Sequence, residues 1–124
     1  MNKLQLKAGM RILVLNPPGR PDEFLKPLPP DTVLVAKGKA NMAVAFVRTK
    51  AEAHALTTQA LKSIPNDALL WLCYPKGGSG VKSEVNRTVL WKELLQYGIR
   101  PVTQRALSPV WSAMRFRPID KVGE

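Results

Sequence analysis

The sequence is poor in the residues that build disulfides, metal centres and acid–base catalytic pairs. It contains one cysteine, Cys73, and one histidine, His54. One cysteine cannot form a disulfide within the chain, and no cysteine or histidine pair has the spacing of metal ligands. We therefore expect neither a structural disulfide nor a bound metal. A lone thiol inside an apolar run also suits a reducing compartment, which favours the cytoplasm.

Long apolar segments and aromatic side chains are scarce as well. No stretch is long enough to span a membrane, and the first residues lack the apolar centre of a signal peptide, so we expect a cytoplasmic protein without a membrane partner. Aromatic residues make up 6% of a chain that is 45% hydrophobic, which indicates a core of Leu, Val, Ile and Ala. A chain of 124 residues can build one such core. We therefore predict a single domain over residues 1–124.

Acidic residues are the third class in short supply. Nine Asp and Glu stand against 19 Lys and Arg, for a net charge of +10, and the excess is spread over both halves of the chain. Such a charge favours an anionic partner. The partner would be a phosphorylated small molecule, a nucleic acid or an acidic protein. The alternative is that the charge mainly keeps a small protein in solution.

Short apolar runs that end at Pro, Gly or polar residues indicate buried strands. Runs of this kind predict parallel strands at 11–16, 32–36, 42–48 and 68–74. Two further strands, 101–107 and 111–117, are separated only by the turn at 108–110, which predicts an antiparallel hairpin. Trp71 lies in the middle of its run and is predicted to be buried.

Helix start and stop signals lie between these strands. Thr49 and Glu52 are spaced as a capping box, and apolar residues at helical spacing follow as far as Ile64. A second helix is predicted near 86–97 and closes at Gly98. Ser83 or Asn86 is predicted to cap this second helix, and a further short helix is predicted at 22–28. Trp91 lies one step off the apolar face of the second helix and should be partly buried.

The alternation of strands and helices predicts a small Rossmann-like α/β domain with a mostly parallel sheet, helices on both faces and a C-terminal antiparallel hairpin. One connection is short, because only residues 37–41 separate the second and third strands. Either the second strand is short and its linker runs along the sheet, or the two strands pair antiparallel. We prefer the first arrangement, with strand one between strands two and three and the hairpin at the far edge.

Basic residues follow the end of each predicted parallel strand. Ligands of open α/β sheets bind at this carboxyl edge. After the fourth strand, the stretch YPKGGSG leads toward a helix start, where free backbone N–H groups favour anions. The alternative is a turn of small residues that lets a buried strand leave the core. The predicted anion-binding residues are Arg20, Arg48, Lys76, Gly77, Gly78, Ser79 and Lys82. The wider basic rim adds Lys37, Lys39 and Lys50.

Several tempting catalytic patterns fail on their details. Lys76 precedes its glycines, so the loop is not a Walker loop, whose lysine follows them. His54 has no acidic partner at helical spacing, which favours a structural role. Cys73 is expected to be a small buried hydrophobe. Trp111 and Ser112 point to opposite faces of a strand, which predicts core packing for the first and a local hydrogen bond for the second.

Four segments carry a resemblance to known families: LVLNPPG, ALLWLCYPK, NRTVLW and WSAMRFRP. With these segments the whole chain resembles a domain-of-unknown-function family of short bacterial proteins. The last third is also similar, more distantly, to the end of a methyltransferase-type Rossmann domain. The resemblance implies a small Rossmann-like fold and brings no established activity with it.

The sequence departs from the methyltransferase pattern at both cofactor-binding positions. Such enzymes place a GxGxG turn after strand one and an acid at the end of strand two. Here the first position reads NPPGRP, with one glycine, and the second reads AKGK, with two lysines. We therefore expect no adenosylmethionine binding, and no other cofactor.

These observations favour a non-catalytic binding or regulatory module that takes an anionic partner at its basic rim. An enzyme would need an acid–base pair near the rim, where only Asp22, Glu23 and Glu84 are available. Two alternatives stay open: a small enzyme that uses a nucleotide or adenosylmethionine, and a subunit that dimerises along the hairpin edge. A nucleic-acid binder should present exposed aromatic side chains beside its basic residues, and Tyr74 is the one aromatic residue adjacent to the rim in sequence. The sequence identifies neither the ligand nor the choice between monomer and homodimer.

Overall fold

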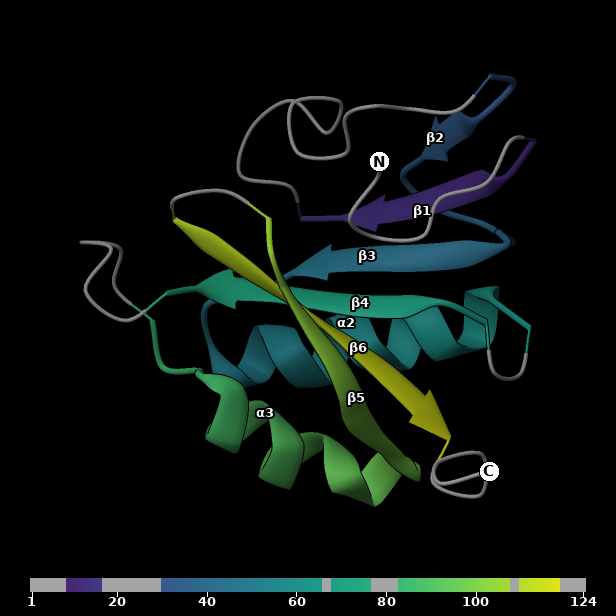
Figure 1. Cartoon of the computed structure of the whole chain (residues 1–124). Helices are drawn as coiled ribbons and strands as arrows, with labels where there is room; N and C mark the ends of the chain where they lie inside the picture. Colours follow the sequence, from purple (N-terminus) through teal and green to yellow (C-terminus); the bar gives the residue numbers. More distant parts are fainter. Residues whose placement is uncertain (1–8, 17–29, 66–67, 77–82, 108–109, 119–124) are drawn as a thin grey trace.

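A twisted six-stranded sheet of order β2-β1-β3-β4-β6-β5 forms the centre of the molecule (Figure 1). The computed structural model describes residues 9–16, 30–65, 68–76, 83–107 and 110–118. Its strands are β1 (Arg11–Leu15), β2 (Val33–Val35), β3 (Met42–Phe46), β4 (Leu70–Pro75), β5 (Ile99–Ala106) and β6 (Trp111–Pro118). The first four run parallel, whereas β6 is antiparallel to both β4 and β5. The predicted α/β class, parallel sheet and C-terminal hairpin are confirmed.

Both described helices, α2 (Lys50–Ser63) and α3 (Arg87–Leu94), pack on one face of the sheet. The predicted capping box is present at the start of α2. Thr49 Oγ1 accepts the Glu52 N–H at 3.0 Å, and Glu52 Oε1 accepts the Thr49 N–H at 3.2 Å. The short helix predicted at 22–28 lies outside the described residues, so a helix on the opposite face stays a prediction.

The second helix begins and ends where its signals predict. Asn86 is the N-cap, and its side chain accepts the Val89 N–H at 2.9 Å. A 3-10 turn, η1 (Leu95–Tyr97), continues α3 as far as Gly98, whose φ of 77° is left-handed. Gly98 closes the helix because glycine adopts this conformation without strain.

The connection between β2 and β3 is the one preferred from the sequence, with a short β2 and a linker that runs along the sheet. β2 pairs only with the first part of β1, and β1 pairs with β3 on its other side. Ala40 is buried and donates its N–H to the Ser63 carbonyl at 2.8 Å, while Asn41 donates to the Arg11 carbonyl at 2.8 Å. The linker therefore runs back along the sheet to the amino end of β1, which lets two parallel strands follow each other without a crossover helix.

Alternate side chains of the strands build two core layers. The layer on the helix side contains Leu13, Leu15, Ala43, Ala45, Leu70, Leu72, Met114 and Phe116, together with Ala53, Ala60, Leu90 and Leu94 of the helices. The opposite layer contains Ile12, Val14, Met42, Val44, Phe46, Trp71, Cys73 and Trp111. Trp71 is 0% exposed, which confirms its predicted burial, whereas Trp91, predicted to be partly buried, is 44% exposed and counts among the exposed large hydrophobic residues.

The thiol of Cys73 gives a direct test of this packing. Cys73 is fully buried, and burial raises the pKa of its thiol because the thiolate would lose its hydration. Since the thiolate is the nucleophile, we expect iodoacetamide to leave Cys73 unmodified in the folded protein at mildly alkaline pH and to alkylate it fully in urea. Mass spectrometry measures the product. Equal labelling rates in both conditions would contradict the buried position of β4.

Candidate anion-binding site

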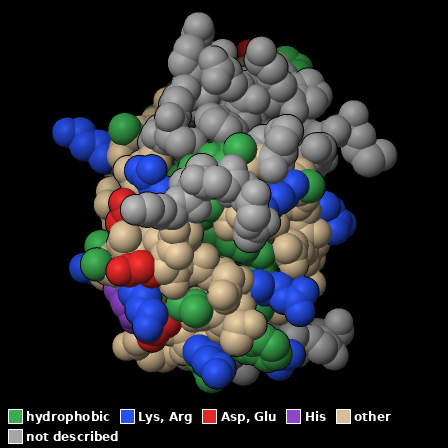
Figure 2. Space-filling model, turned by 90° about the vertical axis from the view of Figure 1, so that its left-hand side faces the viewer, with side chains coloured by type: hydrophobic (Ala, Val, Ile, Leu, Met, Phe, Trp, Pro, Cys, Tyr) green, Lys and Arg blue, Asp and Glu red, His purple; other side chains and the backbone are tan. Residues whose placement is uncertain are grey.

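The carboxyl ends of β1, β3 and β4 lie at one edge of the sheet, which Figure 2 views directly. Acidic side chains gather on one side of this view together with the single histidine, His54 of α2. Lys and Arg side chains occur on both sides, and on the side away from the acids they stand without acidic neighbours in this view. No described helix is both long and apolar enough to cross a membrane.

Two of the predicted site residues, Arg48 and Lys76, belong to the described part of the chain, and they follow adjacent parallel strands. The Lys76 N–H donates to the Val110 carbonyl at 2.7 Å, and the Arg48 carbonyl accepts the Glu84 N–H at 2.7 Å. These bonds hold both residues at the carboxyl edge. The other predicted residues, Arg20, Gly77, Gly78, Ser79 and Lys82, lie outside the described residues, so their part in the site stays a prediction.

Lys39 does not belong to this rim, and its prediction was wrong. Its Nζ donates to the Lys62 carbonyl at 2.9 Å, at the C-terminal end of α2, which lies at the amino ends of the strands. The reason is the shortness of β2. The chain leaves β2 after Val35 and turns back toward the start of β3, and it carries Lys39 to the opposite edge of the sheet.

The described acids beside the edge bind backbone N–H groups. Glu52 Oε1 accepts the N–H of Arg48 at 2.8 Å, and Glu52 Oε2 accepts Asn16 Nδ2 at 3.0 Å. Glu84 Oε1 accepts the Lys50 N–H at 3.1 Å. Neither carboxylate pairs with a basic side chain among the residues the structure describes. Glu52 and Glu84 therefore make no direct ion pair with the rim, whereas Lys50 of the rim lies 3.7 Å from Glu93.

A polar hollow of about 290 Å³ lies beside Lys76. We call it the Tyr74 hollow, and its lining residues are Tyr74, Lys76, Gln104, Arg105, Ala106 and Ser112. Tyr74 and Ser112 are paired neighbours on β4 and β6. Gln104 Nε2 donates to the Tyr74 hydroxyl at 3.0 Å and to Ser112 Oγ at 3.1 Å, so one amide joins three strands.

The hydrogen bonds of the hollow leave it suited to an anion. Gln104 donates to the oxygen of the Tyr74 hydroxyl, so the phenolic O–H is free to donate to a ligand. Lys76 and Arg105 also line the hollow, and neither forms an ion pair with a described acid. Arg105 pairs with Ala113 of the opposite core layer, so its side chain leaves the strand on the other face, and its Nη1 donates to the Gln104 carbonyl at 3.0 Å at the sheet edge. Arg87 approaches from α3 and donates to Gln104 Oε1 at 3.3 Å. The hollow is therefore lined by hydrogen-bond donors and by basic residues.

Sequence reasoning missed most of this hollow. Ser112 makes the predicted local hydrogen bond within the hairpin, because its Oγ accepts from Gln104 Nε2 of β5 at 3.1 Å, but the sequence did not single out Gln104 itself. Tyr74, Arg87 and Ser112, which meet here through Gln104, come from three segments that lie apart in the sequence.

His54 has a structural role, as predicted, but its partners come from another helix. Its Nδ1 lies 2.7 Å from the Tyr97 hydroxyl, and its Nε2 lies 3.7 Å from Glu93 Oε2. Lys50 Nζ lies 3.7 Å from Glu93 Oε1. This group joins α2 to α3 and does not line the Tyr74 hollow. Among the residues of the described ranges, no three His, Cys, Asp or Glu side chains could hold a metal ion.

Comparison with known proteins supports the fold alone. No family model matches the sequence, and no curated protein sequence matches it. Among solved structures, the chain is similar to one in the crystal structure of a fibrillarin/Nop5p complex, with a TM-score of 0.52 and 11% sequence identity. The similarity covers 91% of this chain and 74% of that chain. The domain therefore has a methyltransferase-like Rossmann fold, which agrees with the more distant of the two resemblances.

The described residues do not fit adenosylmethionine in the methyltransferase manner. At the end of β1, Asn16 adopts a left-handed φ of 56°. Its side chain donates to the Phe46 carbonyl and to Glu52, both at 3.0 Å, and so fastens β1 to its neighbours. At the end of β2, Lys37 follows where the family places a ribose-binding acid. The absence of adenosylmethionine binding stays a prediction with this physical basis.

Proposed function

We propose that the chain is a non-catalytic binding module that holds a phosphate-bearing ligand in the Tyr74 hollow at the carboxyl edge of the sheet. The observation that carries the proposal is the hydrogen-bonded group of Tyr74, Gln104 and Ser112 beside two cations, Lys76 and Arg105. A phosphate offers several acceptor oxygens and a charge that these donors match. The predicted rim residues of the YPKGGSG stretch follow Lys76 directly in the sequence.

The described residues favour binding over catalysis. The hollow contains no carboxylate and no histidine among its described lining residues. Glu52 and Glu84 bind backbone N–H groups, while His54 and Glu93 lie between the helices. Acid–base catalysis by a carboxylate or a histidine needs that group within hydrogen-bond reach of the reacting atom, and these four residues are engaged elsewhere.

The hairpin edge favours a monomer. β5 is the outer strand of the sheet, and it contains Pro101 and a register shift between Pro101 and Thr103. It also carries exposed Arg100 and Arg105. Proline, bulges and charges on an edge strand all oppose pairing with a second copy.

Charge reversal in the hollow tests the proposal. We expect inorganic tripolyphosphate to raise the Tm of the parent protein, because a ligand that binds only the native state stabilises it. In the double variant Lys76→Glu/Arg105→Glu this rise should disappear, while the Tm without ligand stays close to that of the parent. Differential scanning fluorimetry measures both values. The rise in the parent should also shrink as salt is added, because these cations lie near solvent.

The matched control is Lys39→Glu/Lys62→Glu, which changes the net charge equally at the opposite edge of the sheet. This control should keep the rise in Tm. If both double variants lost it equally, net charge alone would explain binding. If the Lys76 and Arg105 variant kept it in full, the hollow would not be the site.

A further inference from the structure

A second hollow of about 220 Å³ lies between α3 and β5, beside the first. We call it the Trp91 hollow. Its lining includes Arg87, Trp91, Arg100, Pro101, Gln104 and Met114. Gln104 lines both hollows, and Arg87 binds its amide oxygen. The two spaces therefore form neighbouring parts of one surface along the hairpin.

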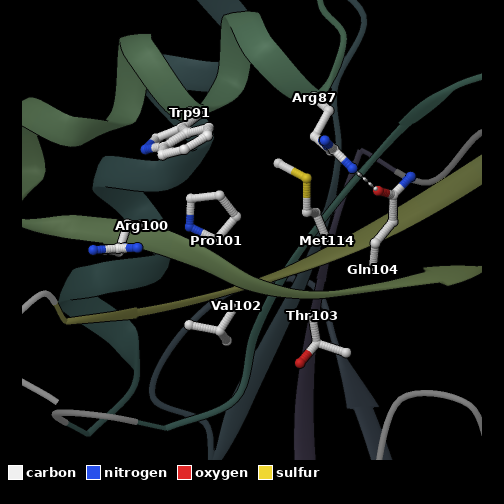
Figure 3. A pocket seen from close by; sticks show the side chains of 8 residues that line it. All are labelled: Arg87, Trp91, Arg100, Pro101, Val102, Thr103, Gln104 and Met114. Atoms are coloured by element: carbon white, nitrogen blue, oxygen red, sulfur yellow. Dashed lines mark hydrogen bonds between the residues drawn. The ribbon is translucent and has the colours of Figure 1, made fainter. Parts of the chain in front are cut away.

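Trp91 is the most exposed tryptophan of the molecule. It is 44% exposed, whereas Trp71 and Trp111 are 0% and 6% exposed. Its neighbour Leu90 faces the sheet, and one step along a helix turns the indole away from that core. Figure 3 shows the indole above Pro101, with Met114 beside it. A large flat ring is thus presented to solvent on an apolar floor.

Positive charge lies on both sides of this ring. Figure 3 shows Arg87 and Arg100 at opposite ends of the hollow, with Trp91 and Pro101 between them. Lys76 and Arg105 continue the positive charge into the Tyr74 hollow. No acidic side chain lines either hollow among the described residues. An occupant should therefore carry several negative charges and at least one flat apolar face.

Single-stranded nucleic acid has this combination, because flat bases alternate with phosphates along the strand. In a duplex the base faces are stacked on one another and cannot reach the indole. An acidic peptide would match the charge but supplies no series of flat rings. We propose that the two hollows bind single-stranded nucleic acid, with one base stacked on Trp91, its flanking phosphates on Arg87 and Arg100, and a further phosphate in the Tyr74 hollow. This inference rests on the proposed function, because it identifies the class of the anionic ligand.

The hydrogen bonds of Gln104 argue against recognition of one particular base at this site. Its two amide hydrogens bind Tyr74 and Ser112, and its oxygen accepts from Arg87. The amide thus holds the shape of the hollows and has no donor left to read a base edge. We expect weak sequence preference and similar binding of RNA and DNA strands, since stacking and phosphate contacts are common to both.

Tryptophan fluorescence measures the stacking directly. Octamers of deoxythymidylate and of uridylate should quench the emission of the parent protein, whereas tripolyphosphate should bind with little quenching. Trp91→Ala should weaken binding of both octamers by about 5- to 150-fold, which corresponds to the loss of one stacked base. Fluorescence anisotropy of labelled octamers gives the affinity of this variant. Trp91→Phe should retain most of the affinity, because a phenyl ring also stacks.

The control is Leu95→Ala, which removes another exposed apolar side chain, 47% exposed, just after α3 and outside the hollow. It should leave octamer affinity unchanged. If tripolyphosphate raises the Tm through Lys76 and Arg105 but octamer affinity does not depend on Trp91, the inference fails and the proposed function stands. If neither tripolyphosphate nor the octamers bind, both fail. Equal affinity for a duplex, or a Trp91-dependent affinity for polyglutamate that matches that of the octamers, would also overturn the inference.

Discussion

Replacement of Trp71 by alanine is expected to lower the free energy of unfolding by about 3–5 kcal/mol. Trp71 is 0% exposed and lies on β4, which has strand neighbours on both sides. Its side chain belongs to the core layer that contains Phe46, and the alanine variant would leave a cavity there. Since small domains have a total stability of about 5–15 kcal/mol, this loss should remove a large part of it.

Urea denaturation followed by circular dichroism measures the effect. The control is Trp91→Ala, which removes the same side chain from a position that is 44% exposed. The control should cost clearly less than the Trp71 variant, because less apolar area is returned to water and no enclosed cavity is left. A midpoint for the Trp71 variant near that of the parent would show that β4 is not a central strand.

The burial of Trp71 could be predicted because it lies in the middle of a continuous apolar run, and this run forms the central strand β4. The order of the first three strands could be predicted from the short linker between β2 and β3. With so few residues between β2 and β3, a parallel arrangement requires β1 to lie between them, and the structure has this order. Lys39 was placed wrongly for the same reason, since the short linker returns it to the amino edge.

The Tyr74 hollow could not be predicted, because a bulge in β5 decides which side chains face it. Pro101 pairs with Phe116, but the next pair is Thr103 with Arg115. Strict alternation from Pro101 would place Gln104 on the opposite face of the sheet. The extra residue, Val102, turns Gln104 to the helix side, as bulges do. In Figure 3, Val102 and Thr103 both project on the other side of the strand.

The bulge in β5 thus determines the orientation of Gln104, on which the proposed site depends. Without it, Gln104 could reach neither Tyr74 nor Arg87, and the two hollows would lose the residue that they share. The sequence contains a proline near this position but no pattern that specifies an inserted residue. Bulges of this kind often re-aim side chains near functional sites.

Replacement of Glu52 by alanine is expected to cost about 2–3 kcal/mol, a large effect for a residue at the surface of the carboxyl edge. Its carboxylate accepts the N–H groups of Arg48 and Thr49, at 2.8 and 3.2 Å, and the Asn16 amide at 3.0 Å. It therefore caps α2 and also holds the end of β1 against the end of β3. Loss of the acceptor leaves three donors without this partner.

A double-mutant cycle separates these two roles. Glu52→Gln keeps an oxygen for the backbone N–H groups but turns an amide toward Asn16, so it should cost about half as much as alanine. Asn16→Gly keeps the left-handed backbone, φ 56°, and removes only the side chain. If the side chains interact as described, the double variant Asn16→Gly/Glu52→Gln should be more stable than the sum of the single effects predicts. Strict additivity in urea denaturation would show that Glu52 acts only as a helix cap, and that the end of β1 is held by the bond from Asn16 to Phe46 alone.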